Sequence, residues 1–130
     1  MATVLLDSSV IFDALNARRN RREYLREIIL GGNALACCPV NITEVYAGLR
    51  DHEAAATGQF LRSLQFFPIT VEVAQTAGLL MREWRQRGVT LSFSDVTISA
   101  VALTNHLALL TDNAKDFPMP ELNLYPLPPG

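Results

Sequence analysis

The chain has few of the residues that build disulfide frameworks and zinc sites. Its 130 residues include two cysteines and two histidines, His52 and His106. The cysteines, Cys37 and Cys38, are adjacent in an apolar run, which disfavours a disulfide between them and provides no metal-type spacing. We therefore expect two buried thiols in a strand and regard zinc, which favours His and Cys ligands, as the less suitable metal.

Long hydrophobic runs are also absent. The chain is 49% hydrophobic, yet no stretch is apolar for long enough to span a bilayer. This content fits one compact domain over residues 1–130 with a substantial core. The first three residues run into a predicted strand without a basic region or cleavage-type segment. We expect a soluble, cytoplasmic protein with no membrane partner.

Lysine is nearly absent, and ten of the eleven basic residues are arginine. The net charge of −2 argues against a general nucleic-acid binder, because phosphate affinity depends on basic side chains. The arginines are nevertheless grouped, with five of them at positions 18, 19, 21, 22 and 26. Their planar guanidinium groups suit phosphate partners. A solvated helix face is an equally good interpretation, since Arg22 and Glu23 each have a like residue one helical turn later.

Apolar runs and helical patterns alternate along the whole chain. Strands are predicted at residues 3–6, 34–38, 66–70 and 107–111, the third of them short and broken by Pro68. Helices are predicted at 10–15, 21–30, 44–49, 53–65, 71–87 and 96–104, the first capped by Ser8 or Ser9 and the third by Asn41 or Thr43. Parallel strands need crossovers, so this alternation predicts an α/β fold with a mainly parallel central sheet flanked by helices on both faces.

Four acidic residues occupy positions that such a fold brings together. Asp7 and Asp112 each follow a predicted strand, Asp95 begins a helix, and Glu44 lies early in another. The carboxyl ends of parallel strands and the N-termini of the following helices face the same rim, which is where ligands bind in open α/β sheets. The sequence therefore predicts that the four carboxylates converge from four separate segments.

Each acid taken alone also has a purely structural explanation. Asp7 could cap a helix, Asp95 could favour a helix dipole, Asp112 could belong to a turn, and Glu44 could be a surface residue. Their joint placement favours a site. Clustered carboxylates repel one another unless a cation offsets their charge, and oxygen ligands select Mg²⁺, with Mn²⁺ as an alternative. Such a site can activate water and stabilise charge on a phosphate, as in nucleases and phosphatases.

Four segments together resemble the PIN-domain ribonucleases, especially the VapC-type toxins of toxin–antitoxin pairs, over essentially the whole chain. They are LLDSSV at 5–10, TEVYAGL at 43–49, DVTISAVA at 95–102 and LLTDNAKDF at 109–117. The resemblance implies a single PIN-like domain. It also implies that Asp7, Glu44 and Asp95 are metal-binding acids and catalytic residues.

The last of these segments supplies the remaining residues of the expected site. By the same resemblance, Thr111 and Asn113 match polar residues of the family's final motif. The fourth acid is Asp112 or Asp116, and the sequence favours Asp112, because the Asp-Phe pair that closes the motif could simply hold a turn. Ser8, next to Asp7, is a secondary residue of the site.

The expected activity is that of a Mg²⁺-dependent endoribonuclease that inhibits translation. The resemblance implies an RNA substrate, a cognate antitoxin that covers the site, and a homodimer. The segment from Leu15 to Leu30 is a possible antitoxin groove or RNA-facing surface, or else a helix hairpin that packs on the sheet. The segment from Ala54 to Leu64 is a possible dimer surface and equally a possible core stripe.

Two other classes of protein fit parts of the pattern. A phosphoryl-accepting signalling domain is also a small α/β fold with an acidic pocket at the strand ends. It would need paired acids after the first strand and a lysine after a late one, whereas Asp7 is followed by two serines and Lys115 lies in a loop. The other alternative is a catalytically silent PIN-fold module that binds RNA or antitoxin.

Overall fold

The structure is a computed structural model and describes residues 1–128. The strands are β1 (Thr3–Leu6), β2 (Ala34–Cys37), β3 (Gln65–Phe66) and β4 (Ala108–Leu110). The helices are α1 (Ser8–Leu15), α2 (Arg21–Leu30), α3 (Pro39–Ala47), α4 (Ala54–Arg62), α5 (Val71–Gln86) and α6 (Phe93–Thr104). Two short 3₁₀ helices, η1 (Asp51–Glu53) and η2 (Ala114–Asp116), complete the chain.

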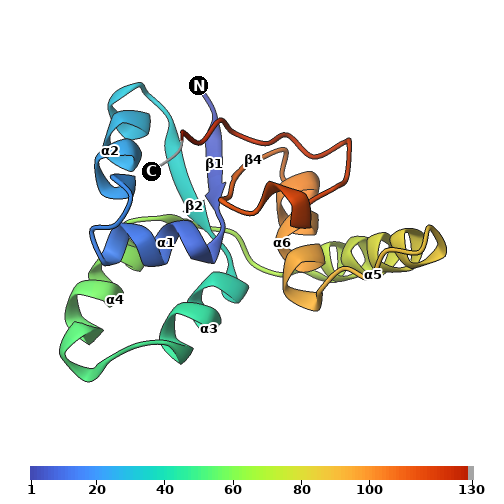
Figure 1. Cartoon of the computed structure of the whole chain (residues 1–130), viewed down its shortest axis with the longest axis horizontal. Coiled ribbons are helices and arrows are strands. Elements are labelled where there is room, and N and C mark those ends of the chain that lie inside the picture. Colours follow the sequence, from blue (N-terminus) through green and yellow to red (C-terminus); the bar gives the residue numbers. More distant parts are fainter. Residues whose placement is uncertain (129–130) are drawn as a thin grey trace.

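The strands form one parallel sheet in the order β3-β2-β1-β4. Figure 1 shows β2, β1 and β4 next to one another. Val4 of β1 pairs with Leu35 of β2 on one side and with Ala108 of β4 on the other. The predicted parallel α/β fold is therefore confirmed. Because β1 and β4 are neighbours, the residues that follow them, Asp7 and Thr111, emerge side by side at the carboxyl edge of the sheet.

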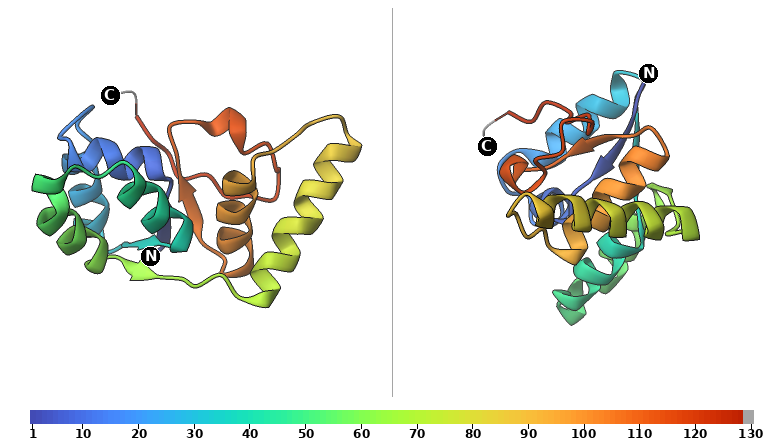
Figure 2. Two further views of the ribbon diagram at one scale, coloured as in Figure 1. Left: turned by 90° about the horizontal axis from the view of Figure 1, so that it is seen from below. Right: turned by 90° about the vertical axis from the view of Figure 1, so that its right-hand side faces the viewer.

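Helices cover both faces of the sheet, and each face has its own core. The side chains of Val4 and Leu6 pack with α1, α2 and α4, whereas Leu5 packs with α5 and α6. This division follows from the two-residue period of a strand, which sends neighbouring side chains to opposite faces. Figure 2 shows the two groups of helices on either side of the strands. None of the helices within residues 1–128 is both long and apolar enough to cross a membrane.

Several predicted boundaries were wrong for identifiable reasons. The strand predicted at 66–70 ends at Phe66, because Pro68 has no N–H for a ladder and Thr70 instead caps α5, its hydroxyl accepting from the Val73 N–H at 3.1 Å. Helix α3 begins at Pro39, earlier than predicted. Asn41 therefore lies inside its first turn, where its amide accepts from the Cys38 N–H at 2.9 Å.

The cysteine pair has the predicted environment. Cys37 and Cys38 are both buried at the end of β2, and both are free thiols. Burial is the main cause that raises the pKa of the Cys37 thiol to about 11, and it also raises the pKa of Cys38. Both side chains therefore act as small apolar core residues rather than as nucleophiles.

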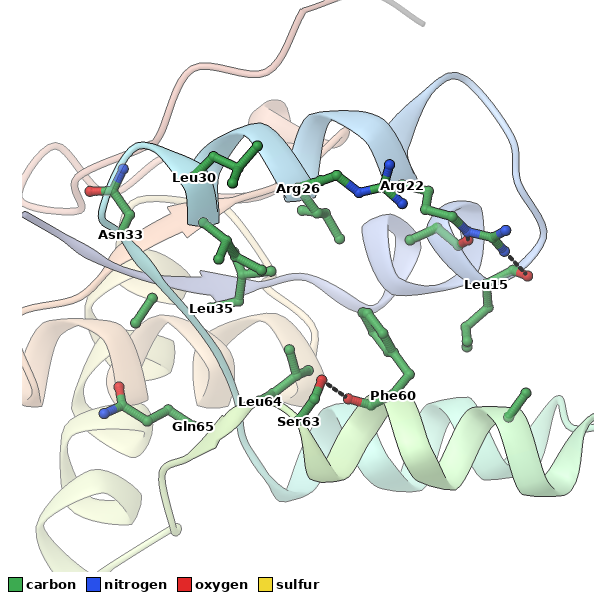
Figure 3. A pocket seen from close by; sticks show the side chains of 15 residues that line it. Leu15, Arg22, Arg26, Leu30, Asn33, Leu35, Phe60, Ser63, Leu64 and Gln65 are labelled. Carbon is green, nitrogen blue, oxygen red and sulfur yellow. Dashed lines mark hydrogen bonds between the residues drawn. The ribbon is translucent and has the colours of Figure 1, made fainter.

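A groove of about 760 Å³ runs between α2 and α4 on the face of the sheet that carries α1 (Figure 3). Its walls are largely apolar and include Leu35 and Phe60, and Arg22 and Arg26 lie along the α2 side. The predicted apolar stripe of α4 is mainly core, because Leu61 and Leu64 are buried. The remaining apolar residue of that stripe, Phe60, forms a wall of the groove.

Candidate active site

Asp7 begins the site at the end of β1. Its carboxylate caps α1 by accepting from the Ser8 N–H at 2.9 Å, so the cap is Asp7 itself rather than the predicted serines. It also accepts from the Thr111 hydroxyl at 2.7 Å. Asp7 is 7% exposed. Burial raises the pKa of its carboxyl above the usual range, with a smaller contribution from the charge of Glu44, while the hydrogen bonds oppose this rise.

Glu44 lies on α3 and reaches the same rim. Its two carboxylate oxygens accept from two hydroxyls, that of Ser8 at 2.6 Å and that of Ser94 at 2.9 Å. The buried Asn41 amide donates to the Ser8 hydroxyl at 3.1 Å and to the Leu6 carbonyl at 3.0 Å. These bonds connect β1, α1, α3 and α6, and they hold Glu44 toward Asp7.

Asp95 lies in the first turn of α6, where the Ser92 hydroxyl caps the helix by accepting from the Asp95 N–H at 3.0 Å. Burial is the largest cause that raises the pKa of its carboxyl. The negative charges of Asp7, Asp116 and Glu44 raise it further. Asp95 therefore lies in one electrostatic neighbourhood with Asp7, Glu44 and Asp116. Asp116 belongs to η2 and is exposed.

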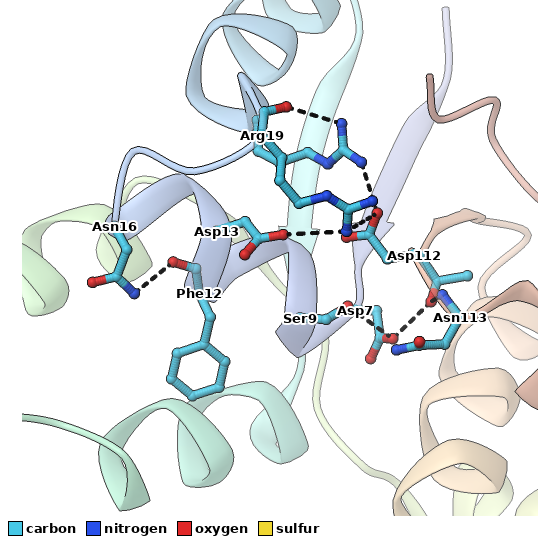
Figure 4. A network of polar contacts seen from close by, with 10 residues as sticks. Asp7, Ser9, Phe12, Asp13, Asn16, Arg19, Asp112 and Asn113 are labelled. Carbon is cyan, nitrogen blue, oxygen red and sulfur yellow. Dashed lines mark hydrogen bonds and ion pairs between the residues drawn. The ribbon is translucent and has the colours of Figure 1, made fainter. Parts of the chain in front are cut away.

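Asp112 has a different environment, although it also follows a strand. One of its carboxylate oxygens accepts from the Arg21 guanidinium at 2.7 Å and lies 3.0 Å from that of Arg19 (Figure 4). Arg21 is 1% exposed, and its guanidinium also donates to the Arg19 carbonyl at 3.2 Å. Arg19 further pairs with Asp13 at 3.7 Å. The charge of Asp112 is thus neutralised by protein side chains.

Thr111 and Asn113 form a short relay beside Asp7. The Asn113 backbone N–H donates to the Thr111 hydroxyl at 2.9 Å, and this hydroxyl donates to the Asp7 carboxylate (Figure 4). A hydroxyl that accepts one bond and donates another has a fixed orientation. The predicted polar residues of the last motif therefore orient the carboxylate of Asp7.

The donor chemistry of this rim fits a hard divalent cation. Within residues 1–128, none of the observed ion pairs involves Asp7, Glu44 or Asp95. Hydroxyl donors contact the carboxylates of Asp7 and Glu44, a backbone N–H also donates to that of Asp7, and hard oxygen ligands suit Mg²⁺ or Mn²⁺. In the described part of the chain, however, no three acidic, His or Cys side chains are close enough to share one ion. Ion binding would therefore require the carboxylates to turn away from their hydroxyl donors.

Three residues of this region were missed in the sequence. Asn41 and Ser94 were predicted only as hydrogen-bonding caps of their helices, and Arg21 was grouped with its neighbouring arginines. A signal existed for Ser94, because a serine immediately before an acid of a helix N-terminus is well placed to reach another acid. The partner of Arg21 is 91 positions away, so no local pattern could have identified it.

With this geometry in place, comparison with known proteins assigns the family. A family model described as PIN domain matches residues 4–118. The chain therefore belongs to the PIN-domain family. Within it, the chain is similar to two proteins of Mycobacterium tuberculosis, Ribonuclease VapC19 and Ribonuclease VapC10. The first is 30% identical over 115 residues, which cover 88% of this chain and 92% of the relative. The second is 31% identical over 116 residues, which cover 89% and 86%.

Solved structures show the same fold. The crystal structure of VapBC2 from Rickettsia felis bound to a DNA fragment from its promoter has a TM-score of 0.82 at 19% identity, covering 95% of this chain and 97% of that chain. DNA-bound VapBC from Salmonella typhimurium has a TM-score of 0.81 at 19% identity, covering 96% and 98%. The predicted resemblance to VapC-type PIN-domain proteins is thereby confirmed.

Proposed function

We propose that this protein is a divalent-metal-dependent endoribonuclease and the toxin of a toxin–antitoxin pair. The observation that carries the proposal is a pair of carboxylates, the buried Asp7 and the half-buried Asp95, whose pKa values are both raised by burial and which form no ion pair with a basic side chain in residues 1–128. Burying charge in this way is costly unless something offsets it. The names of the similar M. tuberculosis proteins support ribonuclease as the activity, and inhibition of translation would follow from cutting RNA.

We assign Asp7, Glu44 and Asp95 as the residues that hold the ion, Mg²⁺ or alternatively Mn²⁺. For the fourth acid we now favour Asp116 over Asp112, because Asp116 contributes to the electrostatic environment of Asp95 while Asp112 is paired with two arginines. A bound ion would activate a water molecule and offset the charge that develops on the phosphate.

Hydroxyl groups of this chain would orient the carboxylates and then release their oxygens to the metal ion. The Thr111 hydroxyl holds one Asp7 oxygen, and the Ser8 and Ser94 hydroxyls hold those of Glu44. Such hydroxyls can rotate, so they can release an oxygen to a cation without a shift of the backbone. Asn113 fixes Thr111 and thereby limits the directions that Asp7 can adopt.

We further propose that the groove between α2 and α4 receives the antitoxin. Its apolar lining continues onto Ile29 and Leu30, which are 54% and 78% exposed, and Arg22 and Arg26 would attract acidic side chains. A toxin–antitoxin complex from Klebsiella pneumoniae is among the similar solved structures, which supports a protein partner. The homodimer expected from the resemblance would need a surface other than the buried stripe of α4.

The test is a cleavage assay on structured RNA in Mg²⁺, repeated in EDTA and with the variants Asp7→Asn and Asp95→Asn. We expect cleavage by the wild type in Mg²⁺ and a loss of more than about 100-fold in each other case, beyond the loss typical for residues that merely support a ligand. Cleavage that persists in EDTA or in both variants would exclude the metal mechanism. Failure to cut any RNA would favour the silent binding module.

A further inference from the structure

Phe93 is a large apolar side chain that the fold leaves in water. It is the first residue of α6 and is 77% exposed, more than the aromatic side chains of Phe66 (53%) and Tyr46 (45%). A phenylalanine at this position adds nothing to either core of the sheet. Its ring is therefore free to contact a ligand.

The position of Phe93 relative to the acidic rim is fixed by its neighbours. Ser92 caps the helix through its hydroxyl, and the Ser94 hydroxyl donates to the Glu44 carboxylate at 2.9 Å. The carbonyl of Phe93 itself accepts from the Thr97 hydroxyl at 2.7 Å. The backbone at Phe93 is thus tied on both sides, two residues before Asp95. The ring of Phe93 extends into solvent from this fixed turn, on the helix that carries Asp95.

We propose that Phe93 is a substrate-positioning residue on which one base of the RNA stacks beside the phosphodiester that is cut. This inference rests on the proposed function and specifies how the substrate is held. Every nucleobase has a flat π face, so stacking on an aromatic side chain gives affinity with little dependence on sequence. A base inside a duplex is already stacked, so the base that binds Phe93 must be unpaired.

The charge of the rim explains why a stacking contact is useful here. Acidic side chains repel phosphates, and the chain as a whole carries a net charge of −2. Ionic attraction is therefore weak at this edge, whereas stacking does not depend on the charge of the protein. The contribution of Phe93 to RNA affinity should accordingly be nearly independent of salt concentration, unlike that of an arginine that contacts phosphate.

The matched control for Phe93 is Val71. It is likewise the first residue of a long helix, is 76% exposed, and follows β3, at the edge of the sheet opposite β4. Replacement of either residue by alanine removes exposed apolar surface from a helix N-terminus. Phe93, unlike Val71, lies in the helix turn that carries Asp95 and Ser94, the hydroxyl partner of Glu44.

The experiment measures binding of short RNAs that carry 2-aminopurine at successive unpaired positions, with Asp7→Asn protein so that no cleavage occurs. We expect 2-aminopurine fluorescence to be quenched at one position. Phe93→Ala should abolish this quenching and weaken binding by about 5- to 150-fold, the range for one stacked base. The loss should be similar at low and high salt, Phe93→Trp should restore both signals, and Val71→Ala should leave them unchanged.

Three results would overturn the inference. The first is unchanged quenching and RNA affinity in Phe93→Ala, and the second is a loss of RNA affinity that Phe93→Trp does not restore. The third is a Phe93→Ala protein with unaltered RNA affinity but a changed oligomeric state on gel filtration, which would make Phe93 a protein contact. The proposed nuclease function is judged separately, by cleavage with the wild-type protein in Mg²⁺. Active Phe93→Ala protein with an unchanged kcat/KM would reject the stacking contact and leave the nuclease standing.

Discussion

Two carboxylates at the ends of neighbouring strands have opposite environments in this protein. Asp7, after β1, is contacted by hydroxyl and backbone N–H donors, and burial raises the pKa of its carboxyl. Asp112, after β4, is paired with Arg19 and Arg21. Position at the end of a strand therefore does not define a metal ligand. The informative difference is whether the protein supplies its own cation, because a carboxylate that is already paired has little to gain from another one.

The arginine-paired corner has its own role in the fold. Arg21 begins α2, and the turn before it contains three non-glycine residues with positive φ angles, Ala17, Arg19 and Asn20. Such conformations carry a cost that the surrounding contacts must offset. The buried contact of Arg21 with Asp112 fastens this turn to the end of β4, next to Thr111. Under the proposed assignment of the metal ligands, this corner supports the acidic rim without supplying a ligand to it.

The largest expected effect comes from breaking this pair. Arg21→Met removes the buried guanidinium and should lower the free energy of unfolding by about 3 kcal/mol, since Asp112 is left with a less buried partner. The double variant Arg21→Met/Asp112→Leu should recover most of this loss, because it leaves neither charge unpaired. In addition, Arg21 Nε and Asp112 Oδ2 have no hydrogen-bond partner within residues 1–128.

Urea unfolding of the wild type and of both variants measures these differences. A double variant as unstable as Arg21→Met would mean that packing of the arginine, rather than its charge, holds the corner together.

The second prediction contrasts the two candidates for the fourth acid. Asp116→Asn should raise the Mg²⁺ concentration for half-maximal cleavage by about 10- to 100-fold, the range for residues that support a metal site. The Arg21→Met/Asp112→Leu variant also lacks a carboxylate after β4, but its Mg²⁺ requirement should be unchanged. A raised requirement in the double variant and not in Asp116→Asn would restore Asp112 as the fourth acid.

Much of the fold was accessible from the sequence because its signals are local. The strand predicted at 3–6 coincides with β1 and the helix predicted at 21–30 with α2, where apolar runs and the Gly31–Gly32 ending act on adjacent residues. Helix α3 was placed less well, because tertiary contacts decide the role of a residue in its first turn. Asn41 has local capping chemistry, yet its amide bonds to Leu6 and Ser8, more than 30 positions away.

The same distinction applies to the site. The placement of Asp7 and Asp95 near one another follows from parallel topology, which the alternation of strands and helices predicts. The choice between Asp112 and Asp116 does not, because both follow β4 within a few residues. Only the distant arginines distinguish them, and the pairing of Arg21 with Asp112 depends on how the turn between α1 and α2 folds back on the sheet.

The smallest expected effect is a pH dependence confined to the rim. Because the folded-state pKa values of Asp7 and Asp95 are raised above the ordinary 3.8, the folded protein binds more protons than the unfolded chain in the interval above that value. In EDTA, these two groups should therefore lower stability as pH rises from about 4 through their raised pKa values. Asp95→Asn should remove part of this fall and melt above the wild type at pH 7, but not at pH 4.

Added Mg²⁺ should reverse the ranking at pH 7, since it can offset the charges of the wild type and finds fewer in the variant. Thermal melts of the wild type and Asp95→Asn at pH 4 and pH 7, in EDTA or in Mg²⁺, measure these differences in stability. Asp112→Asn is the contrasting control, because its charge is already paired and its removal should destabilise the protein at pH 7. The contradicting result would be a wild type that is more stable at pH 7 than at pH 4 in EDTA, with the same rise in Asp95→Asn. It would mean that the charged rim carboxylates do not destabilise the fold and do not require a cation.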